Sequence, residues 1–176
     1  MSFTRRKVLT ASALTAGACA IRGLFGNTVF GADGAKTSPR PVILATDIGG
    51  DIDDTWALAL LLKSPELDLK LAVTDYGVPL YRGKILAKFL QTTGHGQTPI
   101  GLGPEYDDAK HSDGALARQA PWVKDYDLEQ YKGPVHHDGA KAIVEVIMRS
   151  PQRVTVISIG PPPTVAAALA IEPRIA

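Results

Sequence analysis

The sequence contains very little cysteine and has almost no net charge. Its one cysteine, Cys19, lies near the N-terminus, so the rest of the chain can form neither a disulfide nor a cysteine-based metal or catalytic site. The 19 Lys and Arg residues nearly balance the 18 Asp and Glu residues, which gives a formal net charge of +1. This balance argues against nucleic acid and against an anionic membrane surface as partners. After residue 40 there is also no internal repeat, no low-complexity tract and no apolar run that would predict a membrane span.

The N-terminal residues have the layout of an export signal. Basic residues at positions 5–7 precede an uncharged stretch, residues 8–21, that is rich in Ala, Leu and Thr. The paired Arg is typical of a twin-arginine signal, and the uncharged stretch is shorter than the roughly 20 apolar residues of a spanning helix. The alternative is an ordinary N-terminus with a chance Arg pair. We expect residues 1–35 to be signal and linker, residues 36–176 to form the domain, and the protein to be exported to the periplasm or cell exterior.

An acidic turn between two apolar segments is the most informative stretch of the chain. Residues 42–45 have the apolar run of a buried strand, and residues 56–62 have the pattern of an apolar helix. Four aspartates and two glycines lie between these segments, with no Lys or Arg among them: Asp47, Gly49, Gly50, Asp51, Asp53 and Asp54. In a parallel α/β sheet, such a turn lies at the carboxyl edge of the strands, where ligands bind.

The crowding of carboxylates on this turn favours a cation site. The free N–H groups and dipole of the following helix can stabilise one or two of the carboxylates, by about 0.3–1 kcal/mol each. A hard divalent cation compensates the rest, because Ca²⁺ takes about six to eight oxygen ligands and carboxylates supply both oxygen and charge. Mg²⁺ accepts the same donors but usually keeps more water. The alternative is one N-capping Asp with solvated neighbours.

Strand and helix patterns alternate along the remaining chain. The further strand and helix candidates are residues 67–74, 79–93, 98–102, 140–149, 153–159 and 165–171. This alternation predicts an α/β fold built on an open, mainly parallel sheet with helices on both faces.

Two segments have both a structural and a functional interpretation. Residues 103–135 lack periodicity and carry several aromatic side chains, which either line a ligand site or pack on the domain; we favour packing. His136 and His137 are adjacent, so their side chains diverge and form a poor metal pair. Asp138 is therefore predicted to be the N-cap of the helix at residues 140–149.

The acidic turn resembles the N-terminal signature of the inosine–uridine preferring nucleoside hydrolases, an Asp-rich strand-to-helix loop of the form D-x-D-P-G-x-D-D-A. The residues that match its core are Asp47, Gly49, Asp53 and Asp54. Ala45 stands where the pattern has its first Asp, Ile48 stands where it has Pro, and the loop carries extra residues that include Asp51. The resemblance covers residues 41–176 and implies a Rossmann-like nucleoside hydrolase fold, of which these residues form a truncated, N-terminal part.

Two further segments are similar to parts of this family. Residues 160–164 resemble the family's strand–GPLTN–helix segment, where a backbone carbonyl ligates calcium, and the corresponding carbonyl belongs to Pro163. After the second strand the family has a Gly-Asn turn at the sugar pocket. Here Gly77 is followed by Val78, so Asp75 is the candidate polar group that binds substrate, its alternative role being that of a turn residue.

The resemblance implies calcium-dependent hydrolysis of the N-glycosidic bond of a ribonucleoside or related N-glycoside, giving free base and sugar. Asp47 and Asp54, with the carbonyl of Pro163, would be the Ca²⁺ ligands. Asp53 would be the general base and would also touch the sugar. One alternative is a secreted calcium- or sugar-binding relative without hydrolase activity. Another is a phosphohydrolase with an Asp nucleophile, which the lack of a D-x-D pattern beginning at Asp47 disfavours.

The family's later segments, an Asn-rich sugar-binding stretch and a His-Asp pair, have no counterpart within these residues. For the 176 residues alone we therefore expect weak turnover of nucleosides. We also expect association into homo-oligomers, because apolar strand edges would be left exposed.

Replacing Arg5 and Arg6 by Lys should retain the protein in the cytoplasm, because the twin-arginine pathway depends on the Arg pair. Fractionation of cells that express the wild type and the double variant measures this. Unchanged export of the variant would rule out the pathway, though not secretion by another route.

Overall fold

The computed structural model describes residues 38–105 and 118–176. The chain divides into two units, Met1–Ala35 and Lys36–Ala176, and all described residues belong to the second unit. The predicted export signal lies outside the described residues and stays a prediction. No helix within the described ranges is long and apolar enough to cross a membrane.

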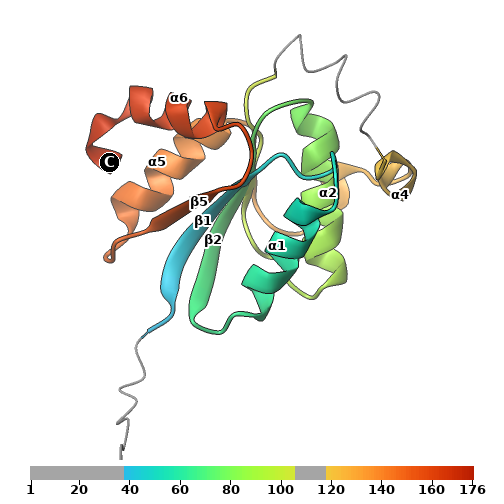
Figure 1. The fold of residues 1–176 in the computed structure, drawn as a ribbon, viewed down its shortest axis with the longest axis horizontal. Coiled ribbons are helices and arrows are strands. Elements are labelled where there is room, and N and C mark those ends of the chain that lie inside the picture. Colours follow the sequence, from blue (N-terminus) through green and yellow to red (C-terminus); the bar gives the residue numbers. More distant parts are fainter. Residues whose placement is uncertain (1–37, 106–117) are drawn as a thin grey trace, which may run out of the picture. The chain divides into compact units, whose positions relative to one another are not determined.

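A parallel sheet of five strands, counted over the described residues, forms the centre of the domain (Figure 1). The strands are β1 (Arg40–Thr46), β2 (Leu67–Thr74), β3 (Ile100–Gly101), β4 (Val135–His136) and β5 (Thr155–Ser158). Their order in the sheet is β4-β3-β2-β1-β5, and every pair is parallel. The short strand β4 was not predicted from the sequence.

Helices cover both faces of this sheet (Figure 1). The described helices are α1 (Asp53–Lys63), α2 (Pro79–Thr92), α4 (Ala120–Val123), α5 (Gly139–Arg149) and α6 (Pro163–Ile171), with 3₁₀ turns η1 (Leu128–Gln130) and η2 (Pro173–Ile175). Helices α1 and α2 pack on one face and α5 and α6 on the other. The structure thus confirms the predicted open parallel α/β sheet with helices on both faces.

Strand β1 is buried on both sides, which explains its unbroken apolar sequence. Val42 and Leu44 belong to the core beneath α1 and α2, whereas Ile43 and Ala45 belong to the core beneath α5 and α6. A register shift in the pairing of β1 with β2 leaves Lys70 as an extra residue in β2.

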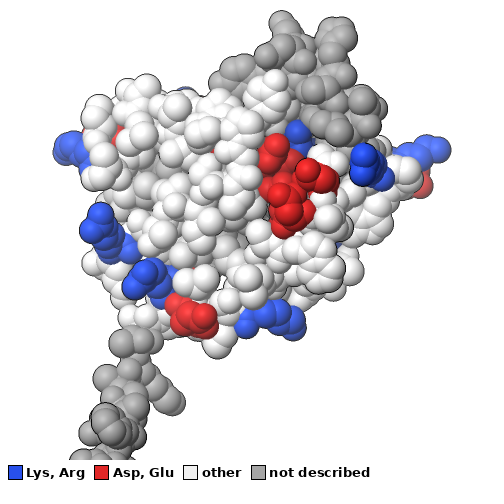
Figure 2. Space-filling view, in the orientation of Figure 1, with Lys and Arg blue, Asp and Glu red and all other residues white. Residues whose placement is uncertain are grey.

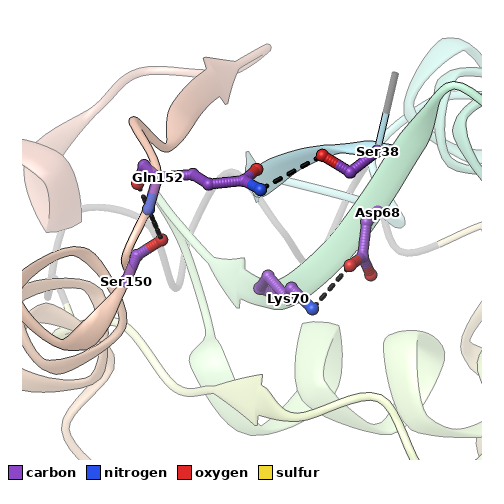
Figure 3. A network of polar contacts seen from close by, with 5 residues as sticks. All are labelled: Ser38, Asp68, Lys70, Ser150 and Gln152. Atoms are coloured by element: carbon purple, nitrogen blue, oxygen red, sulfur yellow. Dashed lines mark hydrogen bonds and ion pairs between the residues drawn. The ribbon is translucent and has the colours of Figure 1, made fainter. Parts of the chain in front are cut away.

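Polar side chains near the amino ends of the strands contact one another before β5 and β1 and within β2 (Figure 3). Gln152, which precedes β5, donates from Nε2 to Ser38 Oγ at 3.1 Å. The Lys70 Nζ atom lies 2.5 Å from Asp68 Oδ2. These groups are exposed or half-buried and lie at the opposite end of the strands from the acidic turn.

The structure bears out both structural interpretations of the ambiguous segments. Asp138 is the N-cap of α5, because its Oδ1 accepts a hydrogen bond from Lys141 N at 3.0 Å. In the described part of the long loop, Tyr126 and Tyr131 are buried in the core beneath α2, and the Tyr131 hydroxyl donates to Thr98 O at 2.6 Å. The part of this loop at residues 106–117 lies outside the described residues.

Candidate metal centre and active site

The acidic turn lies at the point where the order of the strands reverses. From β1 the chain builds the sheet outward through β2, β3 and β4, and then returns to place β5 on the other side of β1. The turn after β1 and the loop after β5 therefore meet at the carboxyl edge of the sheet, which is where open α/β sheets bind ligands. Figure 2 shows acidic side chains gathered in one patch near the start of α1.

Three carboxylates of this turn can reach a single cation. Asp51, Asp53 and Asp54 each offer a carboxylate oxygen, and these oxygens lie within 4.8 Å of one another. A side-chain hydrogen bond between Asp51 and Asp53 raises the pKa of Asp51 and lowers the pKa of Asp53. Of these two exposed aspartates, Asp53 is therefore the one whose charged form is favoured. The all-oxygen donor set is the one that hard divalent cations prefer.

Asp54 is the buried member of this group and is held by β1. Its side chain is 4% exposed, and its Oδ1 accepts a hydrogen bond from Thr46 Oγ1 at 2.5 Å. The same hydroxyl accepts from Ile48 N at 3.1 Å, so Thr46 links the strand end to the turn. Burial raises the pKa of Asp54 to about 6, against the opposing effect of the Thr46 hydrogen bond. A bound cation would favour the ionised carboxylate at this position.

Two side chains of helix α2 donate hydrogen bonds to backbone carbonyls of the acidic turn. Arg82 is 2% exposed, and its Nη1 donates to Asp47 O and, at 2.9 Å, to Ile48 O. The Tyr81 hydroxyl donates to Gly49 O at 3.0 Å. Gly49 has φ +105°, and a Cβ there would collide with the side chain of Ile85. The turn therefore needs glycine at this position, both for its backbone conformation and for its close approach to α2.

Sequence reasoning missed the role of Arg82, although a signal was present. Arg82 lies three and four residues before Ile85 and Leu86, which places a cation on the buried face of α2. A cation on an apolar helix face needs acceptors, and here the acceptors are backbone carbonyls of the acidic turn.

The side chain of Asp47 points toward the loop after β5. A Cβ built on Gly160 would collide with the Asp47 carboxylate, so the two loops are in contact at this point. Among the described residues, the group of three close carboxylates includes Asp51, which has no counterpart in the signature, and does not include Asp47.

The other two predicted site residues lie on the neighbouring loops. Asp75 is fully buried after β2, where its Oδ1 accepts a hydrogen bond from Thr164 N at 2.8 Å. Burial raises the pKa of Asp75, and the bonds from Thr164 oppose this effect. Pro163 is the first residue of α6, and Pro162 O accepts from Ala166 N at 3.0 Å. Because a helical carbonyl points toward the next turn, ligation by Pro163 would share its oxygen between a cation and the helix.

Fold and site together define an α/β protein with a candidate divalent-cation site at the switch point of a doubly wound sheet. The chain belongs to the family described as inosine-uridine preferring nucleoside hydrolase, whose sequence model matches residues 42–176. This membership confirms the resemblance of the acidic turn to a hydrolase signature.

Curated relatives and solved structures agree with this assignment. The non-specific ribonucleoside hydrolase RihC of Escherichia coli (strain K12 / DH10B) is 32% identical over 124 residues, which cover 69% of this chain and 40% of the relative. The purine-preferring ribonucleoside hydrolase from Gardnerella vaginalis has a TM-score of 0.58 at 20% identity, covering 77% of this chain and 45% of that one. The inosine-uridine preferring nucleoside hydrolase from Bacillus anthracis has a TM-score of 0.57 at 16% identity. The match covers 77% of this chain and 47% of that one. This chain therefore spans about 40% of the length of the curated relatives it matches.

Substituting Gly160 by Ala should displace the Asp47 carboxylate and lower the free energy of unfolding by about 1–3 kcal/mol, as overpacking does. Chemical denaturation measures this loss. Gly50→Ala is the matched control, because a Cβ there has only Asp47 O nearby, at 4.0 Å.

A double-mutant cycle isolates the contact between the two loops. In an Asp47→Ala background, Gly160→Ala should cost far less than in the wild type, because the colliding carboxylate is gone. Equal costs in both backgrounds would show that the two residues do not meet.

Proposed function

We propose that this chain carries the metal-binding part of a nucleoside hydrolase active site. The reaction is hydrolysis of the N-glycosidic bond of a ribonucleoside or related N-glycoside. The observation that carries the proposal is the group of three carboxylates within 4.8 Å, at the carboxyl edge of the sheet of a nucleoside hydrolase family member. The similarity to ribonucleoside hydrolases supports a nucleoside as the substrate class.

The donor set of the acidic turn fits Ca²⁺. Carboxylate oxygens predominate, one of the carboxylates is already buried and oriented by Thr46, and the glycines leave room for a close approach. We assign Asp47 and Asp54 as ligands, together with the carbonyl of Pro163. The position of Asp51 in the cluster makes it a further ligand candidate. When bound, the ion would hold sugar hydroxyls and lower the pKa of a water.

Asp53 is assigned as the general base. Its carboxylate is exposed at the first residue of α1, and its pKa is lowered by the hydrogen bond with Asp51, so it is ionised at neutral pH and can accept a proton. In the hydrolysis, Asp53 takes a proton from water while the water oxygen bonds to the anomeric carbon. The carbon–nitrogen bond breaks through an oxocarbenium-like transition state, and the leaving base keeps the bonding electron pair and takes a proton from solvent.

Substituting Asp54 by Asn should weaken Ca²⁺ binding by about tenfold or more, because a charged ligand is lost from a buried position. Asp51→Asn should weaken it less, since Asp51 is exposed and has no counterpart in the family signature. Calorimetric titration with Ca²⁺, and with Mg²⁺ in parallel, measures both.

Asp68→Asn is the control for this titration, because it removes an aspartate at the opposite end of the sheet and should leave the affinity unchanged. Equal losses for Asp51→Asn and Asp54→Asn would reject the assignment of ligands. No binding of either ion by the wild type would reject the metal centre itself.

Inosine and uridine incubated with the 176-residue protein and Ca²⁺ should release free base slowly. Asp53→Asn should reduce that release by about 10²–10⁴-fold, because a positioned base is lost. Chromatographic detection of hypoxanthine and uracil over long incubations measures the rate, with Asp68→Asn as the control.

The opposite results separate the alternatives. Base release that is insensitive to Asp53→Asn would contradict the role of this residue. Ca²⁺ and ribose binding without any base release would instead favour a binding protein that lacks hydrolase activity.

A further inference from the structure

Asp75 connects two strand ends and a helix that border the proposed site. It is 0% exposed and follows the last residue of β2. Its backbone N–H donates to Thr46 O, at the end of β1, over 2.8 Å. Its carboxylate Oδ1 accepts from Thr164 N, in the first turn of α6, over 2.8 Å. One residue therefore joins the end of β1 to the start of α6.

The contact supplies an acceptor for the first backbone N–H group at the start of helix α6. Residues 161–163 are all proline and have no backbone N–H group, so Thr164 is the first residue of this segment that can donate. The N-cap residue, Pro162, makes no side-chain capping hydrogen bond. The carboxylate of Asp75 thus caps α6 from a different strand, and its negative charge lies at the favourable end of the helix dipole.

A second set of contacts seats the same turn on the sheet. Thr164 Oγ1 donates to Thr74 O at 3.1 Å, and Gly103 N donates to Thr74 Oγ1 at 2.8 Å. A Cβ on Gly103 would collide with Thr74 O and would come within 2.5 Å of Thr164 Oγ1. The start of α6 therefore rests directly on the ends of β2 and β3, and Asp75 lies beneath it.

The position of α6 in turn determines where the loop before it lies. This loop brings Gly160 against the Asp47 carboxylate and leads into Pro163, the first residue of α6, whose carbonyl is the ligand proposed above. The second oxygen of Asp75, Oδ2, is buried with no hydrogen-bond partner among the described residues. Burying a carboxylate oxygen without a hydrogen-bond partner is unfavourable. An apolar side chain would fill this position at a lower cost in stability, so the carboxylate has a role besides packing.

We propose that Asp75 is a positioning residue that holds residues 160–163 in place against the acidic turn, and that it thereby sets the affinity of the metal centre. This inference rests on the proposed function for its metal. Asp75 acts through Thr164, and not by contact with the ion or the substrate.

Three variants of the full 176-residue chain test the proposal. Asp75→Ala removes the acceptor, and Asp75→Asn keeps an acceptor oxygen at the same place. Tyr131→Phe is the control, because it removes the hydrogen bond of a buried side chain to Thr98 O, away from α6 and the acidic turn. The measurements are calorimetric titration with Ca²⁺ alone and hydrogen exchange of the Thr164 amide in metal-free protein.

Asp75→Ala should weaken Ca²⁺ binding about tenfold or more and should speed exchange of the Thr164 amide by a similar factor, because a buried donor loses its partner. Asp75→Asn should restore both quantities to within about threefold of the wild type. Tyr131→Phe should also stay within about threefold, although it too loses a hydrogen bond of a buried residue. This pattern separates positioning from a general loss of stability.

Unchanged Ca²⁺ affinity in Asp75→Ala, or an equal loss in Tyr131→Phe, would overturn the proposal. If the wild type binds no Ca²⁺ while Asp75→Ala still exposes the Thr164 amide, the proposed metal centre fails and the link between Asp75 and α6 stands. If Asp75→Ala does not fold, exchange in the wild type decides: a Thr164 amide as slow as those of β1 supports the link, and one as fast as an exposed amide overturns it.

Discussion

Electrostatic repulsion among the aspartates after β1 is the constraint on which the rest of this site depends. Like charges on one turn hold together only if the backbone beneath them is anchored and an opposite charge is near. The anchors are visible: Thr46 holds the buried carboxylate of Asp54, and Arg82 donates to two carbonyls of the turn. Arg82 brings a positive charge beneath the turn. The carboxylates on the outer side of the turn are the ones that we propose bind a cation.

The order of the strands brings a second loop, the one after β5, against the acidic turn. Because β5 returns to the other side of β1, the loop before α6 reaches the Asp47 carboxylate from the opposite direction. Asp75 and Thr164 join the two sides through a hydrogen bond between residues 89 positions apart in the chain. A metal centre that draws ligands from both loops needs such a link, since small displacements of one loop would change the distance between its ligands.

The sequence predicted those parts of the fold that local pattern controls. The apolar run of β1, the sheet class and the N-cap at Asp138 follow from burial, periodicity and capping chemistry, which act over a few residues. It missed β4 and assigned more residues to β3 and β5 than these strands have. Strands this short have no periodicity of their own, and their partners in the sheet define them.

For the site, the sequence by itself determined that Asp47, Asp53 and Asp54 share one turn, because covalent neighbours in a strand–turn–helix segment cannot separate. Only the tertiary structure showed that Asp51 joins the close group, that Arg82 supports the turn, and that the carboxylate of Asp75 faces helix α6. The physical reason is the range of the contacts. Repulsion and chain geometry within the turn are local, whereas the hydrogen bonds that orient it come from residues distant in sequence, which only the packing of helices on the sheet brings together.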